Sequence, residues 1–232
     1  RCTRNCRFCA VDSEQPLPPD TAEPEKIAKA VEEMGLDYVV LTSVTRDDLS
    51  DGGAGHFAAL ITAIEEKCRG TRVEILIPDF KGSLDALETV CRSEPAVLNH
   101  NVETVERLYP EVRPQAIYHR SLELLENVKK SNPAIKTKSG LMVGLGESVA
   151  ELERTIRDIR NAGCDLLTIG QYLQPTAAHL PVKRFIPPEE FDRYRDFALN
   201  LGFAGVASGP HVRSSYRAGH LYELAVGQAV QR

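Results

Sequence analysis

Apolar positions follow two alternating spacings along this chain. Short runs of apolar and β-branched residues, typical of strands buried on both faces, occupy 38–42, 73–77, 96–99, 137–143, 166–170 and 203–207. Between them, apolar residues recur every three or four positions, which is the helical spacing. We predict helices from about 24 to 35 and 57 to 68, and over 83–92, 118–131, 188–201 and 217–229.

Capping signals support one of these helices and predict one more. One apolar stripe is formed by Ile27, Ala30, Val31 and Met34. Pro24 lies near its start and Gly35 at its end, the positions that these two residue types favour. Ser148 is followed three residues later by Glu151, which is a capping box that opens a further helix through Ile159.

Strands and helices that alternate in this way predict a parallel sheet in an α/β fold. Right-handed crossovers leave a doubly wound sheet and a barrel both open. No linker divides the chain, so residues 1–232 are predicted to form a single domain. In either fold the functional loops follow the carboxyl ends of the strands. Unusual polar groups lie in three such loops, 42–48, 99–103 and 171–175.

Composition excludes some functional classes. The net charge is −5, acidic and basic residues are interspersed, and nucleic acid is an unlikely partner for such a surface. No run of about 18 apolar residues is present, so we expect no membrane span. Three of the six cysteines lie within the first nine residues, and Cys68, Cys91 and Cys164 are scattered. This distribution suits a metal site in a reducing cytosol better than a disulfide framework.

The first nine residues contain Cys2, Cys6 and Cys9 in a C-x3-C-x2-C arrangement. Three thiolates on one short loop can each bind one iron of a [4Fe–4S] cubane, which leaves the fourth iron without a protein ligand. S-adenosylmethionine can chelate such an iron through its amino and carboxylate groups. An electron from the reduced cluster then breaks a carbon–sulfur bond and yields a 5′-deoxyadenosyl radical. The spacing therefore predicts a radical-generating cluster, with Phe8 placed to pack beside an adenine.

Two other interpretations of the cysteine loop remain open. A structural zinc site usually has four ligands, and the next candidate after Cys9 is as distant as His56. A thioredoxin-like C-x-x-C motif would use only Cys6 and Cys9 and would leave Cys2 unexplained. The cluster accounts for all three cysteines. His100 and His211 lack metal-ligand spacing and are predicted to be neutral, hydrogen-bonded histidines.

Further motifs accompany the cysteine loop. They are 44–53 (VTRDDLSDGG), 74–79 (EILIPD), 98–104 (LNHNVET), 137–147 (TKSGLMVGLGE), 170–175 (GQYLQP) and 213–216 (RSSY). With these motifs, the chain resembles the lipoyl synthase family of the radical S-adenosylmethionine superfamily from Cys2 to about Tyr216. The fold that this resemblance implies is a partial parallel (β/α)6 barrel of the TIM type.

The activity implied by the resemblance is insertion of two sulfur atoms into an octanoyl chain attached to a lysine of a lipoyl carrier domain. The implied cofactors are S-adenosylmethionine, one [4Fe–4S] cluster that cleaves it, and an auxiliary [4Fe–4S] cluster that is consumed as the sulfur source. The carrier would be the glycine cleavage H protein or the E2 component of a 2-oxoacid dehydrogenase. The reductant would be ferredoxin or flavodoxin.

Residue roles follow from the matching motifs. Cys2, Cys6 and Cys9 match the ligands of the radical-generating cluster. Ser215 matches the hydroxyl ligand of the auxiliary cluster, with Ser214 as the alternative, and an alkoxide is a weaker partner for iron than a thiolate. Arg213 and Tyr216 are expected in the same catalytic region. Residues expected to contact S-adenosylmethionine are Phe8, Thr42, Arg46, Asp47, Asn101, Glu103, Lys138 and Gln171.

Several of these contacts have plainer alternatives. Asn101 and Glu103 could be a helix cap and a solvated acid rather than ligands of the ribose or methionyl group. Arg46 and Asp47 could belong to a surface charge run. Gln171 could simply satisfy backbone groups.

The chain departs from the family pattern at its beginning. The family holds its auxiliary cluster with three cysteines upstream of the radical loop, and no residues precede Arg1 here. Cys68, Cys91 and Cys164 are predicted to be core residues that do not replace them. We therefore expect a fragment without the auxiliary-cluster segment, whose first barrel strand, just before Cys2, is truncated.

Two further function classes remain as alternatives. One is another sulfur-inserting radical enzyme, similar to biotin synthase, and the other is a metal-binding module without catalytic activity. The cysteine pattern suits a reducing compartment; the expected location is a bacterial cytoplasm, and mitochondria or plastids remain open.

Overall fold

The computed structural model describes the backbone of residues 1–230 and the side chains of residues 1–227. Six parallel strands form one sheet in the order β1-β2-β3-β4-β5-β6. Their bounds are Tyr38–Thr42, Arg72–Leu76, Val97–Asn99, Lys136–Val143, Leu166–Gln171 and Gly205–Gly209. All six predicted strands are confirmed, although the last begins two residues later than expected. Phe203 precedes this strand and is buried in the core.

The strand order decides between the two predicted architectures. A doubly wound sheet reverses its strand order at a switch point, and this sheet runs in sequence order without a reversal. Within the described residues, β1 and β6 each pair with one strand only. The sheet is therefore open and has the form of a partial barrel, as the family resemblance implied.

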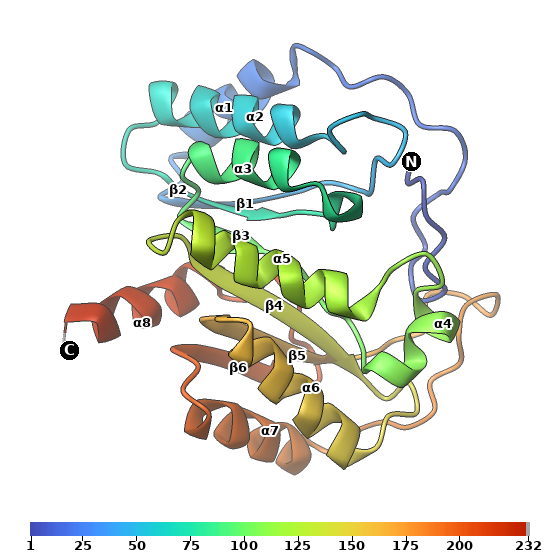
Figure 1. Cartoon of the computed structure of the whole chain (residues 1–232). Coiled ribbons are helices and arrows are strands. Elements are labelled where there is room, and N and C mark those ends of the chain that lie inside the picture. Colours follow the sequence, from blue (N-terminus) through green and yellow to red (C-terminus); the bar gives the residue numbers. More distant parts are fainter. Residues whose placement is uncertain (231–232) are drawn as a thin grey trace.

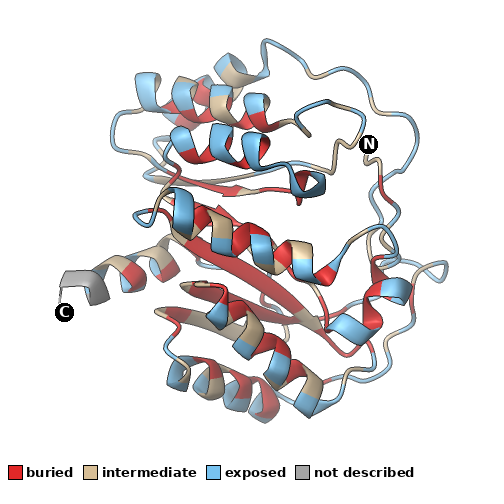
Figure 2. Ribbon diagram, viewed as in Figure 1, coloured by how far each residue is buried: buried red, intermediate tan, exposed pale blue. Residues whose placement is uncertain are grey.

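Helices cover the outer face of this sheet (Figure 1). They are α1 (Glu23–Met34), α2 (Ala54–Lys67), α3 (Leu84–Arg92), α5 (Tyr118–Ser131), α6 (Val149–Asn161) and α7 (Pro188–Asn200). Their inward faces and strand β4 are buried, whereas their outward faces are exposed (Figure 2). Three short elements, η1 (Phe80–Gly82), η2 (Glu106–Leu108) and α4 (Tyr109–Val112), were not predicted because three or four residues are too few to repeat the helical spacing. No described helix is long and apolar enough to cross a membrane.

The capping predictions are confirmed at both helices, but part of one apolar stripe was assigned wrongly. Gly35 ends α1 with a left-handed backbone, and Ser148 and Glu151 form both bonds of a capping box at α6. The buried residues of α1 are Ala28 and Val31, whereas Met34 is 68% exposed. Ile27 and Val31 of the predicted stripe do pack in the core, together with Ala28, on the face of α1 that meets α2.

Different segments cover the two ends of the strands. Helix α8 (Ala218–Val230), which confirms the predicted C-terminal helix, packs against β1, β5 and β6. Leu221 and Ala225 of α8 join Val97 and Leu166, the first residues of β3 and β5, in a small core of their own. The N-terminal segment lies on the side of the molecule opposite α8 (Figure 1). The carboxyl ends of the strands therefore face the cysteine loop.

Candidate functional site

The cysteine loop is held by backbone hydrogen bonds from three distant parts of the chain. The Thr3 amide donates to the Thr45 carbonyl (3.0 Å) and the Arg7 amide donates to the Val112 carbonyl (3.0 Å). The Leu180 amide donates to the Arg7 carbonyl at 3.1 Å. These contacts join the loop to the segment after β1, to the last residue of α4 and to the segment after β5. Its position over the sheet is thus fixed from several sides.

Cys2, Cys6 and Cys9 are free, half-buried thiols that line one cavity of about 200 Å³. Backbone amides approach two of the sulfurs, with Arg4 N 3.4 Å from Cys2 Sγ and Val11 N 3.5 Å from Cys9 Sγ. Hydrogen bonds to sulfur are among the features that tune iron–sulfur clusters. Three thiols around one cavity with amides directed at their sulfurs fit a [4Fe–4S] cluster.

A single-ion site places different demands on these ligands. Among the described residues, no group of three Cys, His, Asp or Glu side chains converges closely enough to hold one metal ion. A cubane does not require such convergence, because each thiolate binds a different iron.

Arg113 provides a positive charge beside the cysteines. Its buried guanidinium lines the same cavity and donates to the Asn101 and Val102 carbonyls, both at 3.1 Å. Burial raises the pKa of the Cys6 thiol, and the charge and hydrogen bond of Arg113 act in the opposite direction. Iron binding requires the thiolate form, so Arg113 offsets part of the penalty of burial.

A second cavity of about 300 Å³ adjoins the first over the ends of β4 and β5. Phe8, Asn101 and Glu103 line both cavities. Gly140 and Gly170 lie in the wall of the second cavity, where a Cβ atom at Gly140 would come within 2.7 Å of Asn101 Oδ1. The two cavities therefore share one polar wall, and the absence of side chains at the glycines keeps the second one open.

Asn101 and Glu103 form the polar part of this shared wall. Asn101 Nδ2 donates to Glu103 Oε1 (3.1 Å) and to Ser214 Oγ (2.8 Å). Burial raises the pKa of Glu103, against the effects of Arg113 and Asn101. Glu103 also adopts a left-handed backbone (φ 71°), which is uncommon outside glycine and is found at functional sites. The wall thus offers carboxyl and amide oxygens to hydroxyl or amino groups of a ligand.

Asn101 Oδ1 has an unmet hydrogen-bonding capacity. It is buried and accepts no hydrogen bond from the described part of the chain. A buried acceptor without a donor is unfavourable, and a bound ligand with a hydroxyl or amino group would relieve that cost. This favours the ligand interpretation of Asn101 over a helix cap.

The first two residues of the RSSY segment (213–216) line the second cavity, and the last two do not. Arg213 and Ser214 line the second cavity. Ser215 has an exposed side chain and lies outside the lining of both cavities. Tyr216 is also exposed and lines a separate hollow beside β6. The structure thus brings the alternative serine, Ser214, to the cavity wall and places Ser215 just beyond it.

The other predicted contact residues mostly engage protein groups. Thr42 is exposed at the end of β1, and Arg46 forms an ion pair with Asp48 (2.8 Å). Lys138 is fully buried against Glu74 at 2.8 Å. Gln171 lines the second cavity, but its Nε2 donates to three backbone carbonyls, including that of Val143 at 3.1 Å.

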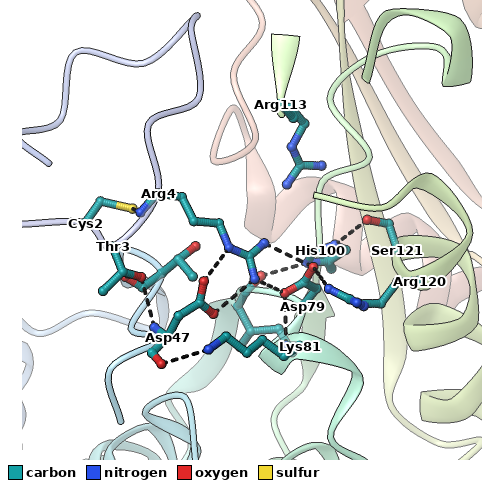
Figure 3. A network of polar contacts seen from close by, with 12 residues as sticks. Cys2, Thr3, Arg4, Asp47, Asp79, Lys81, His100, Arg113, Arg120 and Ser121 are labelled. Atoms are coloured by element: carbon teal, nitrogen blue, oxygen red, sulfur yellow. Dashed lines mark hydrogen bonds and ion pairs between the residues drawn. The ribbon is translucent and has the colours of Figure 1, made fainter. Parts of the chain in front are cut away.

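Sequence reasoning missed the charged group beneath the cysteine loop. Asp47 and Asp79 both bind Arg4, which lies within the cysteine motif itself (Figure 3). The available signal was an arginine between two cysteines of the motif, and spacing does not reveal that such a side chain is buried. Arg113 was missed for the same reason. The remaining cysteines, Cys68, Cys91 and Cys164, pack in the core as predicted.

The predicted state of His100 is confirmed. The ring is buried, with Nδ1 2.9 Å from the Ile77 carbonyl and Nε2 3.0 Å from Ser121 Oγ. Burial lowers its pKa from 6.5 to about 4, so the ring is neutral near pH 7.

Comparison with known proteins agrees with this geometry. The model of the radical SAM superfamily matches residues 1–159. Lipoyl synthase from Alkaliphilus metalliredigens is 54% identical over 222 residues, which cover 96% of this chain and 77% of that relative. Lipoyl synthase from Chlorobaculum tepidum is 57% identical over 94% of this chain and 75% of the relative. These relatives support lipoyl synthase rather than the biotin synthase-like and non-catalytic alternatives.

Solved structures of low sequence identity share the fold. Methylornithine synthase (PylB) superposes with a TM-score of 0.62 at 16% identity, over 92% of this chain and 71% of that chain. Streptococcus suis SuiB bound to S-adenosylmethionine superposes with a TM-score of 0.68 at 14% identity, over 94% of this chain and 50% of that chain. The fold, the cysteine cavity and the sequence relatives lead to one assignment: the chain belongs to the lipoyl synthase family, the sulfur-inserting enzymes of the radical SAM superfamily.

Proposed function

We propose that Cys2, Cys6 and Cys9 hold the [4Fe–4S] cluster of this enzyme and that S-adenosylmethionine extends from it into the second cavity. The observation that carries the proposal is the wall of Phe8, Asn101 and Glu103, which lines both cavities. When bound, the reduced cluster supplies the electron that cleaves S-adenosylmethionine and so generates the radical.

The residues of the wall would each bind a different part of S-adenosylmethionine. The Phe8 ring offers an apolar face for the adenine, and Asn101 Oδ1 and the Glu103 carboxyl accept from hydroxyl or amino groups. Arg213 also lines the second cavity, where its Nη1 donates to the Gln171 carbonyl at 3.4 Å. Thr42, Arg46, Asp47, Lys138 and Gln171 are further proposed contacts of S-adenosylmethionine, taken from the family motifs, and Gln171 among them lines the second cavity.

The cluster assignment can be tested by anaerobic reconstitution with iron and sulfide. The chain should bind a [4Fe–4S] cluster and release 5′-deoxyadenosine from S-adenosylmethionine when dithionite is added. Cys6→Ala should abolish nucleoside release, since one iron loses its thiolate. Cys68→Ala, whose thiol lies in a helix-helix contact 3.4 Å from the Ala28 carbonyl, is the matched control and should retain it. Binding of zinc alone, with no nucleoside, would contradict the assignment.

For the sulfur-donating step we propose Ser215 as the hydroxyl ligand of an auxiliary [4Fe–4S] cluster, with Tyr216 and Arg213 beside it. The exposure of Ser215 supports this role, because its hydroxyl is accessible to a group outside the cavity, whereas Ser214 Oγ already accepts from Asn101.

The two serines form a matched pair for testing this role. In a chain that carries the auxiliary-cluster cysteines, Ser215→Ala should stop lipoyl formation and leave nucleoside release largely intact. Ser214→Ala should weaken both, because Asn101 loses a partner in the shared wall. Equal loss of both activities in Ser215→Ala would contradict the proposed division.

The substrate of the family is a lipoyl carrier, and we propose the glycine cleavage H protein or a 2-oxoacid dehydrogenase E2 component as the specific carrier. Ferredoxin or flavodoxin is the proposed reductant, and a bacterial cytoplasm the proposed location. Residues 1–232 would act as one catalytic domain. Incubation with each octanoylated carrier and each reductant, followed by mass measurement of the carrier, tests these assignments.

A further inference from the structure

Arg4 lies between two of the cluster cysteines, yet its side chain is directed away from solvent. That side chain is 4% exposed, whereas Asn5 and Arg7 of the same loop are exposed. The guanidinium binds Asp47 through Nε (2.7 Å) and Nη2 (3.0 Å). It binds Asp79 through Nη1 (3.1 Å) and Nη2 (2.6 Å). Arg4 is thus gripped by two carboxylates, each in a bidentate arrangement (Figure 3).

The two carboxylates are themselves fixed. Asp79 is 1% exposed and also accepts from the Lys81 amide (3.1 Å) and from Arg120 (3.5 Å). The Asp47 amide donates to Thr3 Oγ1 at 2.9 Å, so Asp47 holds the loop at a second residue. Burial alone would raise the pKa of Asp79, but Arg4 outweighs it and lowers the pKa to about 2. The clamp is therefore ionised at neutral pH.

We propose that Arg4, Asp47 and Asp79 are positioning residues that set the Cys2 and Cys6 thiols for cluster binding. The inference rests on the proposed cluster assignment of these cysteines. A flexible loop would lose conformational entropy when it closes around a cluster, and a loop fixed beforehand loses less. The clamp also aims the Arg4 amide at Cys2 Sγ, 3.4 Å away.

Geometry argues for positioning rather than for stability alone. A buried ion pair contributes little net stability, because desolvation offsets the attraction of the charges. A doubly bidentate guanidinium instead fixes the orientation of the side chain, which a lysine or an apolar residue does not do. The three participants come from the loop itself, from the segment after β1 and from the segment after β2, so the clamp ties the thiols to two strand ends.

The test compares Asp79→Asn and Arg4→Lys with the wild type after anaerobic reconstitution. Asp79→Asn keeps the size of the side chain but replaces one of its two acceptor oxygens by a donor, and Arg4→Lys keeps the charge but removes the planar fork that binds both carboxylates. The readouts are iron and sulfide per chain and the rate of cluster loss to an excess of iron chelator. Loss of a residue that supports metal ligands typically lowers metal affinity by roughly 10- to 100-fold, so we expect faster cluster loss by about tenfold or more.

Asp165→Asn is the matched control for a general effect on folding. Asp165 is a partly buried carboxylate that accepts from the Thr137 amide (2.9 Å) and pairs with Lys129, and it immediately precedes β5, at the end of the sheet opposite the cysteines. The Asp165→Asn substitution should lower the midpoint of thermal unfolding without changing the rate of cluster loss from folded chains.

Two results would overturn the inference. One is cluster loss from Asp79→Asn and Arg4→Lys at the wild-type rate. The other is cluster loss that follows the thermal midpoint equally in all variants, including Asp165→Asn. The iron content of the wild type separates this failure from failure of the cluster assignment, since a wild type that takes up no [4Fe–4S] cluster refutes both.

Discussion

At the scale of single residues, the inner face of the sheet holds charges without access to water. The Lys138 ammonium lies 2.8 Å from Glu74 Oε1, and both side chains are fully buried. Glu74 Oε2 accepts from the Tyr38 hydroxyl at 2.7 Å. A pair of this kind is costly to break from one side, because the remaining charge stays buried without a partner.

Lys138→Met is therefore expected to destabilise the fold by roughly 3–5 kcal/mol, measured by urea unfolding. The double variant with Glu74→Gln should recover part of that loss, because it removes both charges. A variant that keeps its stability and loses affinity for S-adenosylmethionine would instead support a direct role of Lys138 in cofactor binding.

His100 makes the stability of the chain depend on pH. An unfolded chain protonates this ring below pH 6.5, whereas the folded chain does so only near pH 4. The free energy of unfolding should therefore fall as the pH decreases through this range, by roughly 3 kcal/mol at full effect. Urea unfolding of the iron-free chain between pH 7 and pH 4 measures the slope, which should be smaller in His100→Gln. An equal slope in both proteins would assign the dependence to other groups.

At the scale of elements, the contact between β5 and the loop after β6 depends on a glycine. A Cβ atom at Gly170 would overlap the Val212 carbonyl oxygen, and backbone cannot move aside as a flexible side chain can. A Cβ atom at Gly209 would instead lie 3.5 Å from Val212 Cγ2, which is an ordinary contact.

Gly170→Ala should therefore displace the loop that carries Arg213 to Ser215. We expect a loss of about 1–3 kcal/mol in stability and a marked loss of nucleoside release, because the loop forms part of the cavity wall. Gly209→Ala, assayed in parallel by thermal melting and nucleoside release, should remain close to the wild type. Similar behaviour of the two variants would argue against a close packing requirement at Gly170.

Helix α6 offers a test of an element away from the site. Ser148→Ala removes the capping hydroxyl and should cost about 1 kcal/mol in chemical denaturation. Nucleoside release per folded chain should not change, because α6 lies on the outer face of the sheet. A loss of activity beyond the unfolded fraction would show that α6 influences the cavities.

At the scale of the whole molecule, α8 links the first strand of the sheet to the last. Leu221 is 3% exposed, and Gly205 at the start of β6 leaves room for it. Leu221→Ala should cost roughly 2–5 kcal/mol, because the cavity opens where three strands and a helix meet. Leu224 of the same helix is 41% exposed, so Leu224→Ala should change the midpoint of urea unfolding little. An equal effect of the two substitutions would mean that α8 is not packed as described.

The order of strands and helices could be predicted because each element repeats one spacing over several residues. The cysteine loop and the wall at Asn101 and Glu103 could be located because loops after parallel strands gather at one end of the sheet. The clamp of Arg4 could not, because its partners lie 43 and 75 residues away and Asp47 was expected to contact S-adenosylmethionine rather than an arginine. Burial of a charge depends on the tertiary fold, and no local spacing encodes it.

The clamp also imposes an order of events during biosynthesis. Cys2, Cys6 and Cys9 leave the ribosome before Asp47, Asp79, Gln115 and His179, whose contacts hold the loop in place. Iron delivered to the nascent chain would meet thiols with no fixed arrangement. The thiols are therefore held in place only once the chain has folded as far as His179, and metal should bind after that stage rather than during synthesis.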